Sequence, residues 1–372
     1  MNRVLGICNL HDTPSLGQLT KTRPLGALSF LSRYGLMDFT LSNFSNSQID
    51  RVVILAENNA TAILSHTQQG TAWINNTKTG YLRLAINEKM IDSPKFNTDV
   101  ANMQMHYSII RDSNPEYIII APTFFLMSLD FREVLEAHEE SGAEASIVYV
   151  KTKNAKKEYI NCDAFEITSN NVIDHTRVNV GETKTANISL ETFVLNRETF
   201  DKLLEMAPKV SALYGIRKII NYAINRHLIV VNGYEYDGYV VPILSANDYV
   251  NKSFELLAYE NRQKLFRDDW PIYTTTHNTP PALYGANADV KNSFVANGSI
   301  IKGKVENSII SRDVVVEEGA EVKNSIIFTH AKVGEKVKLK YVLADKHSVI
   351  KQVKRLSGEK EEVLVVTLGA KI

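Results

Sequence analysis

The chain has 372 residues, of which 44% are hydrophobic and 23% are charged, so it is long enough to form two domains with buried cores. Lysine and arginine total 42, and aspartate and glutamate also total 42, so no net charge attracts nucleic acid or an anionic membrane. The two cysteines, Cys8 and Cys162, and the absence of a long apolar run argue against a disulfide framework, a zinc cluster and a membrane span. We expect a cytoplasmic location.

Short apolar runs predict buried β-strands at residues 51–56, 117–121 and 145–150. A helix is predicted at residues 131–141, and it should end at Gly142, because glycine readily adopts the left-handed conformation of a helix C-cap. Strand and helix alternate over roughly 250 residues, which predicts a doubly wound α/β domain with a mostly parallel sheet. Ligands of such a domain bind beyond the carboxyl ends of the strands.

Proline pairs mark the end of this domain, since Trp270-Pro271 and Pro280-Pro281 flank a stretch rich in threonine and asparagine. We therefore divide the chain into an α/β domain at residues 1–260, a linker at 261–286 and a C-terminal domain at 287–372.

A short unit recurs in the C-terminal domain. Val290-Lys291-Asn292-Ser293, Val305-Glu306-Asn307-Ser308 and Val322-Lys323-Asn324-Ser325 are each followed by two apolar residues, and a weaker copy starts at Leu339. The starts are 15, 17 and 17 residues apart, as in a parallel β-helix in which each unit is one coil. Stacked coils bury one another's apolar faces, so the open ends require coverage by another domain or subunit. A β-meander with chance similarity is the alternative.

A distinctive set of residues precedes the first predicted strand and continues along the chain. It consists of Phe30, Tyr34, Asp38-Phe39-Thr40-Leu41-Ser42-Asn43, Asn46-Ser47 and Ile49, followed by Ile63, His66, Gly70 and Asp130, and by Trp270, Pro271, Ile272, Pro280, Pro281 and Ala282 in the linker. In these residues the chain resembles bacterial glucose-1-phosphate adenylyltransferases, or ADP-glucose pyrophosphorylases. The resemblance covers nearly the whole chain. It implies a Rossmann-like nucleotidyltransferase domain followed by a left-handed parallel β-helix with a C-terminal tail.

The chain departs from this family at the residues that carry its chemistry. Family members have Gly-Gly-x-Gly-x-Arg before a Leu-x-x-Leu-Thr helix start, because glycines let backbone N–H groups approach a triphosphate that the arginine neutralises. An ungapped count from Leu19 gives Leu10-His11-Asp12-Thr13-Pro14-Ser15 in this place. Pro14 lacks an N–H group, and Asp12 adds a negative charge where a polyanion would bind.

Further departures remove the metal and sugar-phosphate ligands. The two family carboxylates that bind Mg²⁺ align with Phe124 and Pro242, and neither side chain offers the oxygen that a hard cation requires. The family's Phe-x-Glu-Lys-Pro segment holds the sugar phosphate, and its lysine aligns with Val178. The lysine of the family's Arg-Ala-Lys-Pro motif aligns with Leu25, and only Arg23 of that motif is retained. The lost family positions are therefore Leu10, His11, Thr13, Ser15, Leu25, Phe124, Val178 and Pro242. Phosphoryl transfer depends on positioning and charge neutralisation, so efficient turnover is not expected.

This pattern resembles the non-catalytic D-type (GlgD) regulatory subunit of the family. The resemblance implies a subunit that is inactive or nearly inactive alone and that raises ADP-glucose synthesis by a catalytic partner in glycogen biosynthesis. We expect a heterotetramer, with a homo-oligomer alone as a further possibility, no bound cofactor in this chain, and Mg²⁺ in the partner only. The alternatives are a weakly active adenylyltransferase, which makes ADP-glucose and pyrophosphate from ATP and glucose 1-phosphate, and a non-catalytic sugar-nucleotide sensor.

Several polar residues have competing interpretations. Asp38 could be an orphaned catalytic carboxylate, and Ser42, Asn43, Asn46 and Ser47 could bind a ligand, but small polar residues at helix starts and turns usually satisfy backbone groups. We favour structural roles for all five. For His11 a role as a base is disfavoured because no partner lies at a triad or metal spacing. His330 and His347 resemble the histidines of β-helix acyltransferases, which have longer coils.

Basic residues near both ends of the chain could form an effector pocket. The family gathers basic residues from its N-terminal region and its C-terminal domain to bind a phosphorylated effector, for which fructose 1,6-bisphosphate is a candidate. An ordinary solvated charge run is the alternative. The candidate residues are Lys21, Arg23, Arg33, Lys351, Lys354 and Arg355.

Overall fold

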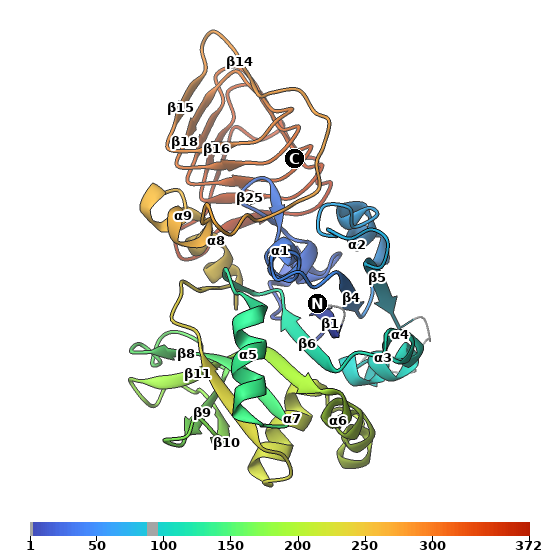
Figure 1. Ribbon diagram of the computed structural model, residues 1–372. Helices are drawn as coiled ribbons and strands as arrows, with labels where there is room; N and C mark the ends of the chain where they lie inside the picture. Colours follow the sequence, from blue (N-terminus) through green and yellow to red (C-terminus); the bar gives the residue numbers. More distant parts are fainter. Residues whose placement is uncertain (1–2, 88–95) are drawn as a thin grey trace. The chain divides into compact units, whose positions relative to one another are not determined.

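The computed structural model describes residues 3–87 and 96–372, and Figure 1 shows the course of the chain. The chain divides into two compact units. One, which we call the α/β unit, comprises Met1–Thr13, Met37–Val240 and Asp268–Tyr273. The other, which we call the coil unit, comprises Pro14–Leu36, Val241–Arg267 and Thr274–Ile372. No helix in the described ranges is long and apolar enough to cross a membrane.

A nine-stranded sheet forms the centre of the α/β unit. Its strands are β1 (Val4–Asn9), β4 (Arg51–Ala56), β5 (Tyr81–Ile86), β6 (Tyr117–Pro122), β8 (Ala145–Thr152), β9 (Asp163–Ile167), β10 (Ile173–Val178), β11 (Ala186–Asn196) and β12 (Val231–Glu235), with the short β7 (Phe125–Leu126) outside it. Strands β6, β1, β4 and β5 run parallel in that order, and β12 is parallel to β8. The predicted strands at 51–56, 117–121 and 145–150 are thus confirmed.

Strand β11 joins these parallel parts because it runs antiparallel to both β6 and β8. Strands β9 and β10 continue the antiparallel pairing at one end of the sheet. The sequence did not predict this antiparallel region, whose strands carry a register shift between Ser189 and Thr192.

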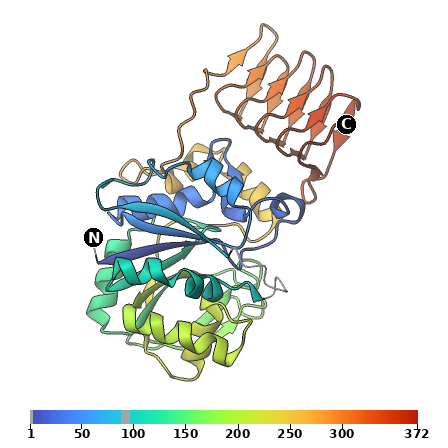
Figure 2. The ribbon, with the colours of Figure 1, turned by 90° about the vertical axis from the view of Figure 1, so that its right-hand side faces the viewer.

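Helices cover both faces of the sheet (Figure 2). They are α1 (Met37–Asn46), α2 (Ala60–Thr67), α3 (Asp99–Met105), α4 (Tyr107–Ser113), α5 (Phe131–Ser141), α6 (Arg197–Val210) and α7 (Ile216–Asn225). Residues of α3, α6 and α7 share one apolar core with strand residues such as Leu5 and Ile120. Phe44 of α1 stacks on Phe131 of α5 at 4.7 Å, and a Cβ atom on Gly6 would lie 2.8 Å from the Phe44 ring. Gly6 therefore lets α1 approach β1 closely.

Helix α5 has the predicted bounds. The Asp130 side chain accepts a hydrogen bond from the Arg132 N–H at its start, and Gly142 at its end has φ 62°. Both ends follow the chemistry of the sequence, since aspartate is a favoured N-cap and glycine a favoured left-handed C-cap.

The coil unit contains a parallel β-helix built from three five-stranded sheets. The first consists of β14 (Leu283–Tyr284), β17 (Ile300–Ile301), β20 (Val315–Val316), β23 (Lys332–Val333) and β26 (Val349–Ile350). The second consists of β15 (Asp289–Lys291), β18 (Lys304–Glu306), β21 (Glu321–Lys323), β24 (Lys338–Lys340) and β27 (Arg355–Ser357), and the third of β16 (Phe294–Val295), β19 (Ile309–Ile310), β22 (Ile326–Ile327), β25 (Val342–Ala344) and β28 (Leu364–Val366). The prediction of a C-terminal parallel β-helix is confirmed.

The rest of the coil unit combines two helices with short strands and turns. Helices α8 (Ala246–Glu255) and α9 (Tyr259–Leu265) follow the short strand β13 (Val241–Pro242), and the N-terminal segment contributes β2 (Ser29–Phe30), β3 (Tyr34–Gly35) and the 3₁₀ turns Gly17–Thr20 and Leu25–Ala27. The Tyr249 hydroxyl of α8 donates to the Ser29 carbonyl at 2.5 Å, and its ring lies 6.4 Å from Phe328 of the coil.

The repeated tetrapeptides place identical residues above one another. Val305 and Val322 are fully buried and paired in register. The serines form a ladder, in which the Ser308 hydroxyl accepts from the Ser325 N–H at 3.1 Å, and the Ser325 hydroxyl accepts from the Val342 N–H at 3.1 Å. Each serine thus satisfies a backbone group of the next coil, which explains why the repeat retains it.

Replacement of Ser325 by alanine should destabilise the coil by about 1–3 kcal/mol, because the buried Val342 N–H would lose its acceptor. Urea unfolding measures this loss. Ser293→Ala is the matched control, since Ser293 accepts the same bond from Ser308 but is partly exposed, so water can replace its hydroxyl. Equal losses in the two variants would contradict the assignment.

Candidate functional site

The loop after β1 is the first candidate site, because it lies at the carboxyl end of a central parallel strand. Its first two backbone donors are already used. The Leu10 N–H donates to the Leu55 carbonyl at 2.8 Å, and the His11 N–H donates to the Asn9 side chain at 3.0 Å. A phosphate cradle needs free N–H groups that point at the anion. Residues 10 and 11 do not supply them.

Two carboxylates lie at the start of helix α7, close to this loop. A Cβ atom on Gly215, the residue before the helix, would lie 2.6 Å from Asp99 Oδ1 and 2.8 Å from Asp12 Oδ2. Asp99 is 1% exposed and accepts hydrogen bonds from the Ile216 N–H at 2.9 Å and from Asn9 Nδ2 at 2.8 Å. The first turn of a ten-residue helix favours negative charge. In this chain its own carboxylates occupy that position.

Carboxylate pKa values are raised throughout this region. Burial raises the pKa of Asp99, although the hydrogen bonds that it accepts oppose the shift. The pKa of Asp12 is raised by desolvation and then by the charge of Asp99, and the pKa of Glu57 is raised by desolvation and by both aspartates. These carboxylates therefore repel one another, and an added polyphosphate would increase that repulsion.

Glu191 and Asp163 extend the acidic region through Arg217. The guanidinium holds both carboxylates, with Nε 2.6 Å from Asp163 Oδ2 and Nη1 3.1 Å from Glu191 Oε1. Burial raises the pKa of Glu191 to about 7, and Arg217 only partly offsets that effect. We refer to Asp12, Glu57, Asp99, Asp163 and Glu191 as the acidic cluster.

His11 is buried and contributes no positive charge near neutral pH, because burial lowers its pKa to about 4. Its Nε2 lies 3.0 Å from Asn102 Nδ2, which also donates to the Ala56 carbonyl at 2.9 Å. Nε2 therefore accepts, and the ring proton belongs on Nδ1, which lies 3.7 Å from Glu57 Oε1. In this arrangement His11 has a structural role, because it packs in the interior and forms a hydrogen bond with Asn102.

The positions of the family's metal ligands do not fit Mg²⁺. Phe124 is 2% exposed, and its ring centroid lies 4.8 Å from that of Phe125, while Pro242 lies in β13 of the coil unit. Neither supplies a carboxylate oxygen. Among the described residues, no group of three or more His, Cys, Asp or Glu side chains could hold a metal ion.

The other lost positions have ordinary structural places. Leu25 is fully buried, whereas Val178 is 49% exposed. Thr13 is partly buried and Ser15 exposed. None of the four provides a positive charge for a sugar phosphate.

Polar residues of α1 have the structural roles that we favoured. Asn43 accepts from Trp270 Nε1 at 2.8 Å and donates to the Met127 carbonyl at 3.0 Å, and Asn46 donates to the Pro271 carbonyl at 2.9 Å. The Ser42 hydroxyl accepts from the Tyr273 N–H at 2.8 Å. Further along, Ser47 accepts from the Phe131 N–H at 2.9 Å. Helix α1 thus anchors the segment Asp268–Tyr273.

Asp38 is also structural. It is fully buried, and its Oδ1 lies 2.5 Å from Nε2 of His66 on helix α2. Both residues belong to the family resemblance, and their contact joins α1 to α2.

The six effector candidates all lie in the coil unit, but they differ in exposure. Arg23 is 4% exposed and forms an ion pair with Asp345, which is 2% exposed. The other five, Lys21, Arg33, Lys351, Lys354 and Arg355, are exposed. No hydrogen bond or ion pair among the described residues joins the three N-terminal candidates to the three C-terminal ones.

Arg23 instead lies in a buried charged group that the sequence did not predict. Its guanidinium lies 5.9 Å from the Phe328 ring centroid, and its Nη1 has no hydrogen-bond partner among the described residues. Desolvation lowers the pKa of the adjacent Lys346, and the charge of Arg23 lowers it further. Asp345 is the carboxylate that compensates these cations.

His330 and His347 form a stacked pair on the coil, with ring centroids 5.0 Å apart. Both are exposed, and His330 Nδ1 lies 3.9 Å from Asp313 Oδ2. Neither histidine lines the coil-unit pocket beside helix α8, so that pocket gives the resemblance to acyltransferase histidines no support.

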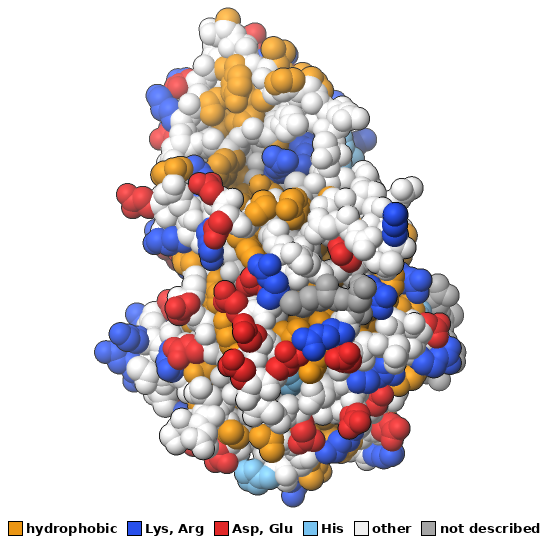
Figure 3. Space-filling model, viewed as in Figure 1, with side chains coloured by type: hydrophobic (Ala, Val, Ile, Leu, Met, Phe, Trp, Pro, Cys, Tyr) orange, Lys and Arg blue, Asp and Glu red, His pale blue; other side chains and the backbone are white. Residues whose placement is uncertain are grey.

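Charges on the surface of the α/β unit are mixed. Figure 3 shows Lys and Arg side chains among Asp and Glu side chains on the face in view. This agrees with the balanced composition of the chain.

Comparisons with known proteins cover both parts of the chain. The nucleotidyl transferase family model matches residues 15–179, and the GlmU-like C-terminal hexapeptide model matches residues 281–362. The second match agrees with the left-handed β-helix predicted above.

Full-length relatives also match. The glycogen biosynthesis protein GlgD of Bacillus subtilis (strain 168) is 28% identical over 99% of this chain and 96% of its own length. Glucose-1-phosphate adenylyltransferases of Clostridium perfringens strains SM101 and 13 are each 26% identical over 86% of this chain, and over 82% and 81% of their own lengths.

The raised pKa of Glu191 predicts a pH-dependent stability. The folded state retains the proton above the ordinary pKa of 4.5, up to about 7, so this contribution is full below pH 4.5 and is lost as the pH rises through about 7. The loss should total roughly 3 kcal/mol. Glu191→Gln should remove this part of the slope when the free energy of unfolding is measured against pH. Glu166→Gln, at an exposed position, should leave the slope unchanged, and an unchanged slope in Glu191→Gln would contradict the prediction.

Phe124→Asp should not restore a metal site. The carboxyl group would replace a buried ring, at a cost of at least about 3 kcal/mol in the free energy of unfolding, and the loop and position 242 would still lack their ligands. Phe124→Leu controls for the loss of the ring and should cost less. Mg²⁺-dependent pyrophosphate release by Phe124→Asp alone would show that fewer features are missing than we infer.

Proposed function

We propose a regulatory function for this chain, which belongs to the glucose-1-phosphate adenylyltransferase family and resembles its GlgD-type members. In this proposal it is a catalytically deficient subunit that raises ADP-glucose synthesis by a catalytic subunit in glycogen biosynthesis. Mg²⁺ acts only in the catalytic partner. Regulation is a population shift, in which this subunit binds the active state of the partner more tightly.

The acidic cluster is the observation that carries the proposed loss of catalysis. Asp12 and Asp99 lie at the N-terminus of α7, where a phosphate would otherwise find a favourable dipole. A nucleoside triphosphate would meet their negative charge, and it would find the N–H groups of residues 10 and 11 already bonded. Charge repulsion and lost donors both act against transition-state binding.

The chain keeps the family's fold, and this supports a function that depends on its surface, such as contact with another subunit. Helix α1 still anchors Asp268–Tyr273 through the residues that match the family. At the first coil of the β-helix, Leu283 is 61% exposed and Tyr284 is 51% exposed, and their strand β14 has one unpaired edge. An apolar solenoid end of this kind favours coverage by another subunit. We propose that the catalytic partner binds this end of the β-helix in a heterotetramer. Without the partner, the same surface would support self-association.

A phosphorylated effector such as fructose 1,6-bisphosphate would bind the exposed basic candidates, Lys21, Arg33, Lys351, Lys354 and Arg355. Arg23 is the weakest candidate because Asp345 already neutralises it in a buried position. An anion that binds Arg23 must first displace this carboxylate, which adds a desolvation cost.

Pyrophosphate release with Mg-ATP and glucose 1-phosphate tests the proposal. We expect no release by the pure chain, and a several-fold higher rate when it is added to a catalytic homologue that has an intact Gly-Gly-x-Gly-x-Arg loop. The two proteins should also co-elute in size-exclusion chromatography. Turnover by the pure chain would favour the weakly active enzyme, and heat on titration of ADP-glucose without turnover would favour the sensor.

A surface variant tests the proposed contact. Leu283→Glu should abolish co-elution and activation, because a charge would be buried in the interface. Leu64→Glu is the matched control, since Leu64 is 49% exposed on α2 of the other unit. Activation that survives Leu283→Glu would remove the coil end from the interface.

A further inference from the structure

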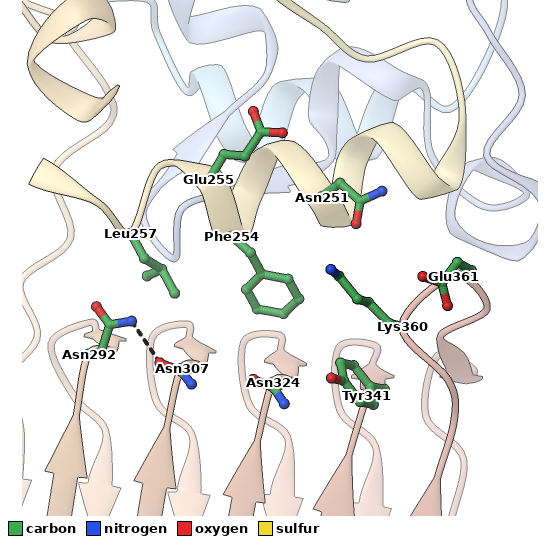
Figure 4. Close-up of a pocket in the computed structure, with 10 residues that line it drawn as sticks. All are labelled: Asn251, Phe254, Glu255, Leu257, Asn292, Asn307, Asn324, Tyr341, Lys360 and Glu361. Atoms are coloured by element: carbon green, nitrogen blue, oxygen red, sulfur yellow. Dashed lines mark hydrogen bonds between the residues drawn. The ribbon is translucent and has the colours of Figure 1, made fainter. Parts of the chain in front are cut away.

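The coil unit contains a pocket of about 540 Å³ between helix α8 and one corner of the coil. Figure 4 shows its two walls, with helix α8 on one side and a ladder of coil residues on the other. Its volume lies in the range of small-ligand pockets. The lining residues are Asn251, Phe254, Glu255, Leu257, Asn292, Asn307, Asn324, Tyr341, Lys360 and Glu361.

The coil wall is built from the third residue of each repeat. Asn292, Asn307 and Asn324 have φ values of 43°, 46° and 45°. Asparagine adopts this left-handed conformation more readily than other residues with a side chain, so the corner itself explains its presence. Tyr341 has φ 51° at the same corner of the next coil, and no such explanation applies, because a bulky side chain is strained there.

The asparagine side chains offer unused hydrogen-bonding groups to the pocket. Asn292 Nδ2 donates to Asn307 Oδ1 at 2.7 Å, which leaves the other polar atoms of this pair available. The side-chain amides of Asn251 and Asn324 make no hydrogen bond to any described residue. Each amide provides both a donor and an acceptor, so the wall can bind groups that do both, as hydroxyls do.

Aromatic and aliphatic surface lies beside these amides. Phe254 points from α8 toward the ladder (Figure 4), and Leu257 and the Tyr341 ring also line the pocket. Aromatic faces bind the C–H faces of a ligand, while their neighbours fix its polar groups.

The charges of the lining nearly cancel. Glu255 forms an ion pair with Lys252 at 2.8 Å, and the remaining two charges, Lys360 and Glu361, have opposite signs. An anion such as a phosphate ester gains little from such a lining. A neutral ligand avoids the cost of desolvating a charge.

We propose that this pocket binds a neutral saccharide. Its hydroxyls would pair with the asparagine amides, and the apolar face of a sugar ring would lie against Phe254. Tyr341 and the loop that carries Lys360 and Glu361 close one end of the pocket (Figure 4). This assigns a place to the charged tail at residues 357–362, for which the sequence contains no recognisable motif.

Calorimetric titration of the full chain with maltotriose and with cellotriose tests the proposal. Both probes are neutral trisaccharides, and they differ in linkage. At least one should bind, and Asn324→Gly should weaken that binding by about tenfold, the effect of losing one or two hydrogen bonds. Glycine retains the left-handed backbone, so the change removes only the amide.

Two further variants separate binding from folding. Lys336→Gly is the matched control, because Lys336 is exposed, has φ 59° on the same coil and does not line the pocket; its binding should be unchanged. Phe254→Leu keeps an apolar side chain without the ring and should also weaken binding, which keeps the test valid if Asn324→Gly unfolds the coil.

Three results would overturn the proposal. They are no heat with either trisaccharide at millimolar concentration, equal binding by Lys336→Gly and both pocket variants, and displacement of the bound sugar by inorganic phosphate. None of them depends on whether the chain activates a catalytic partner.

Discussion

The buried carboxylate of Asp99 holds together the part of the α/β unit that a nucleotidyltransferase would use. It accepts hydrogen bonds from Asn9 at the end of β1 and from the first N–H of α7, and it begins α3. A carboxylate that is 1% exposed is stable only when such donors surround it. Asp99 therefore holds the end of β1 and the starts of α3 and α7 in place. It also adds negative charge at this edge of the sheet.

That negative charge is the physical basis of our expectation that a single substitution would not create a polyphosphate site here. Asp12 shares the start of α7 with Asp99, and the charges of these two aspartates raise the pKa values of Glu57 and Glu191 beyond the effect of burial. A polyphosphate needs the opposite field together with free N–H donors. The loop after β1, the residues at the metal positions and the acidic cluster all disfavour binding of a polyphosphate. In contrast, the α1 side chains that hold Trp270 and Tyr273 remain in place, and they serve only the fold.

The features that could be predicted from the sequence are those that depend on residues close together in the chain. Helix α5 has the expected bounds because Asp130 and Gly142 determine its ends, and the coil was predicted because its repeats are short and regular. Contacts between distant residues were not predictable in this way. Arg23 and Asp345 are 322 positions apart, and the members of the acidic cluster are spread from residue 12 to residue 191. Strand β11 was missed as well, because a strand that bridges two parallel parts has no distinctive pattern.

The adjacent asparagine and serine of each repeat have different structural roles in the coil. Its serine faces inward and bonds to the next coil, so its identity is fixed by buried backbone groups. Its asparagine faces outward at a left-handed corner, where glycine would serve the backbone equally well. The fold therefore requires the left-handed conformation but not the amide, and it does not require an aromatic ring at Tyr341. Within the coil, the Tyr341 ring lies 5.4 Å from Lys340 Nζ. A cation–π contact with an exposed lysine stabilises little, so we assign the conformational strain at Tyr341 chiefly to its place in the pocket wall.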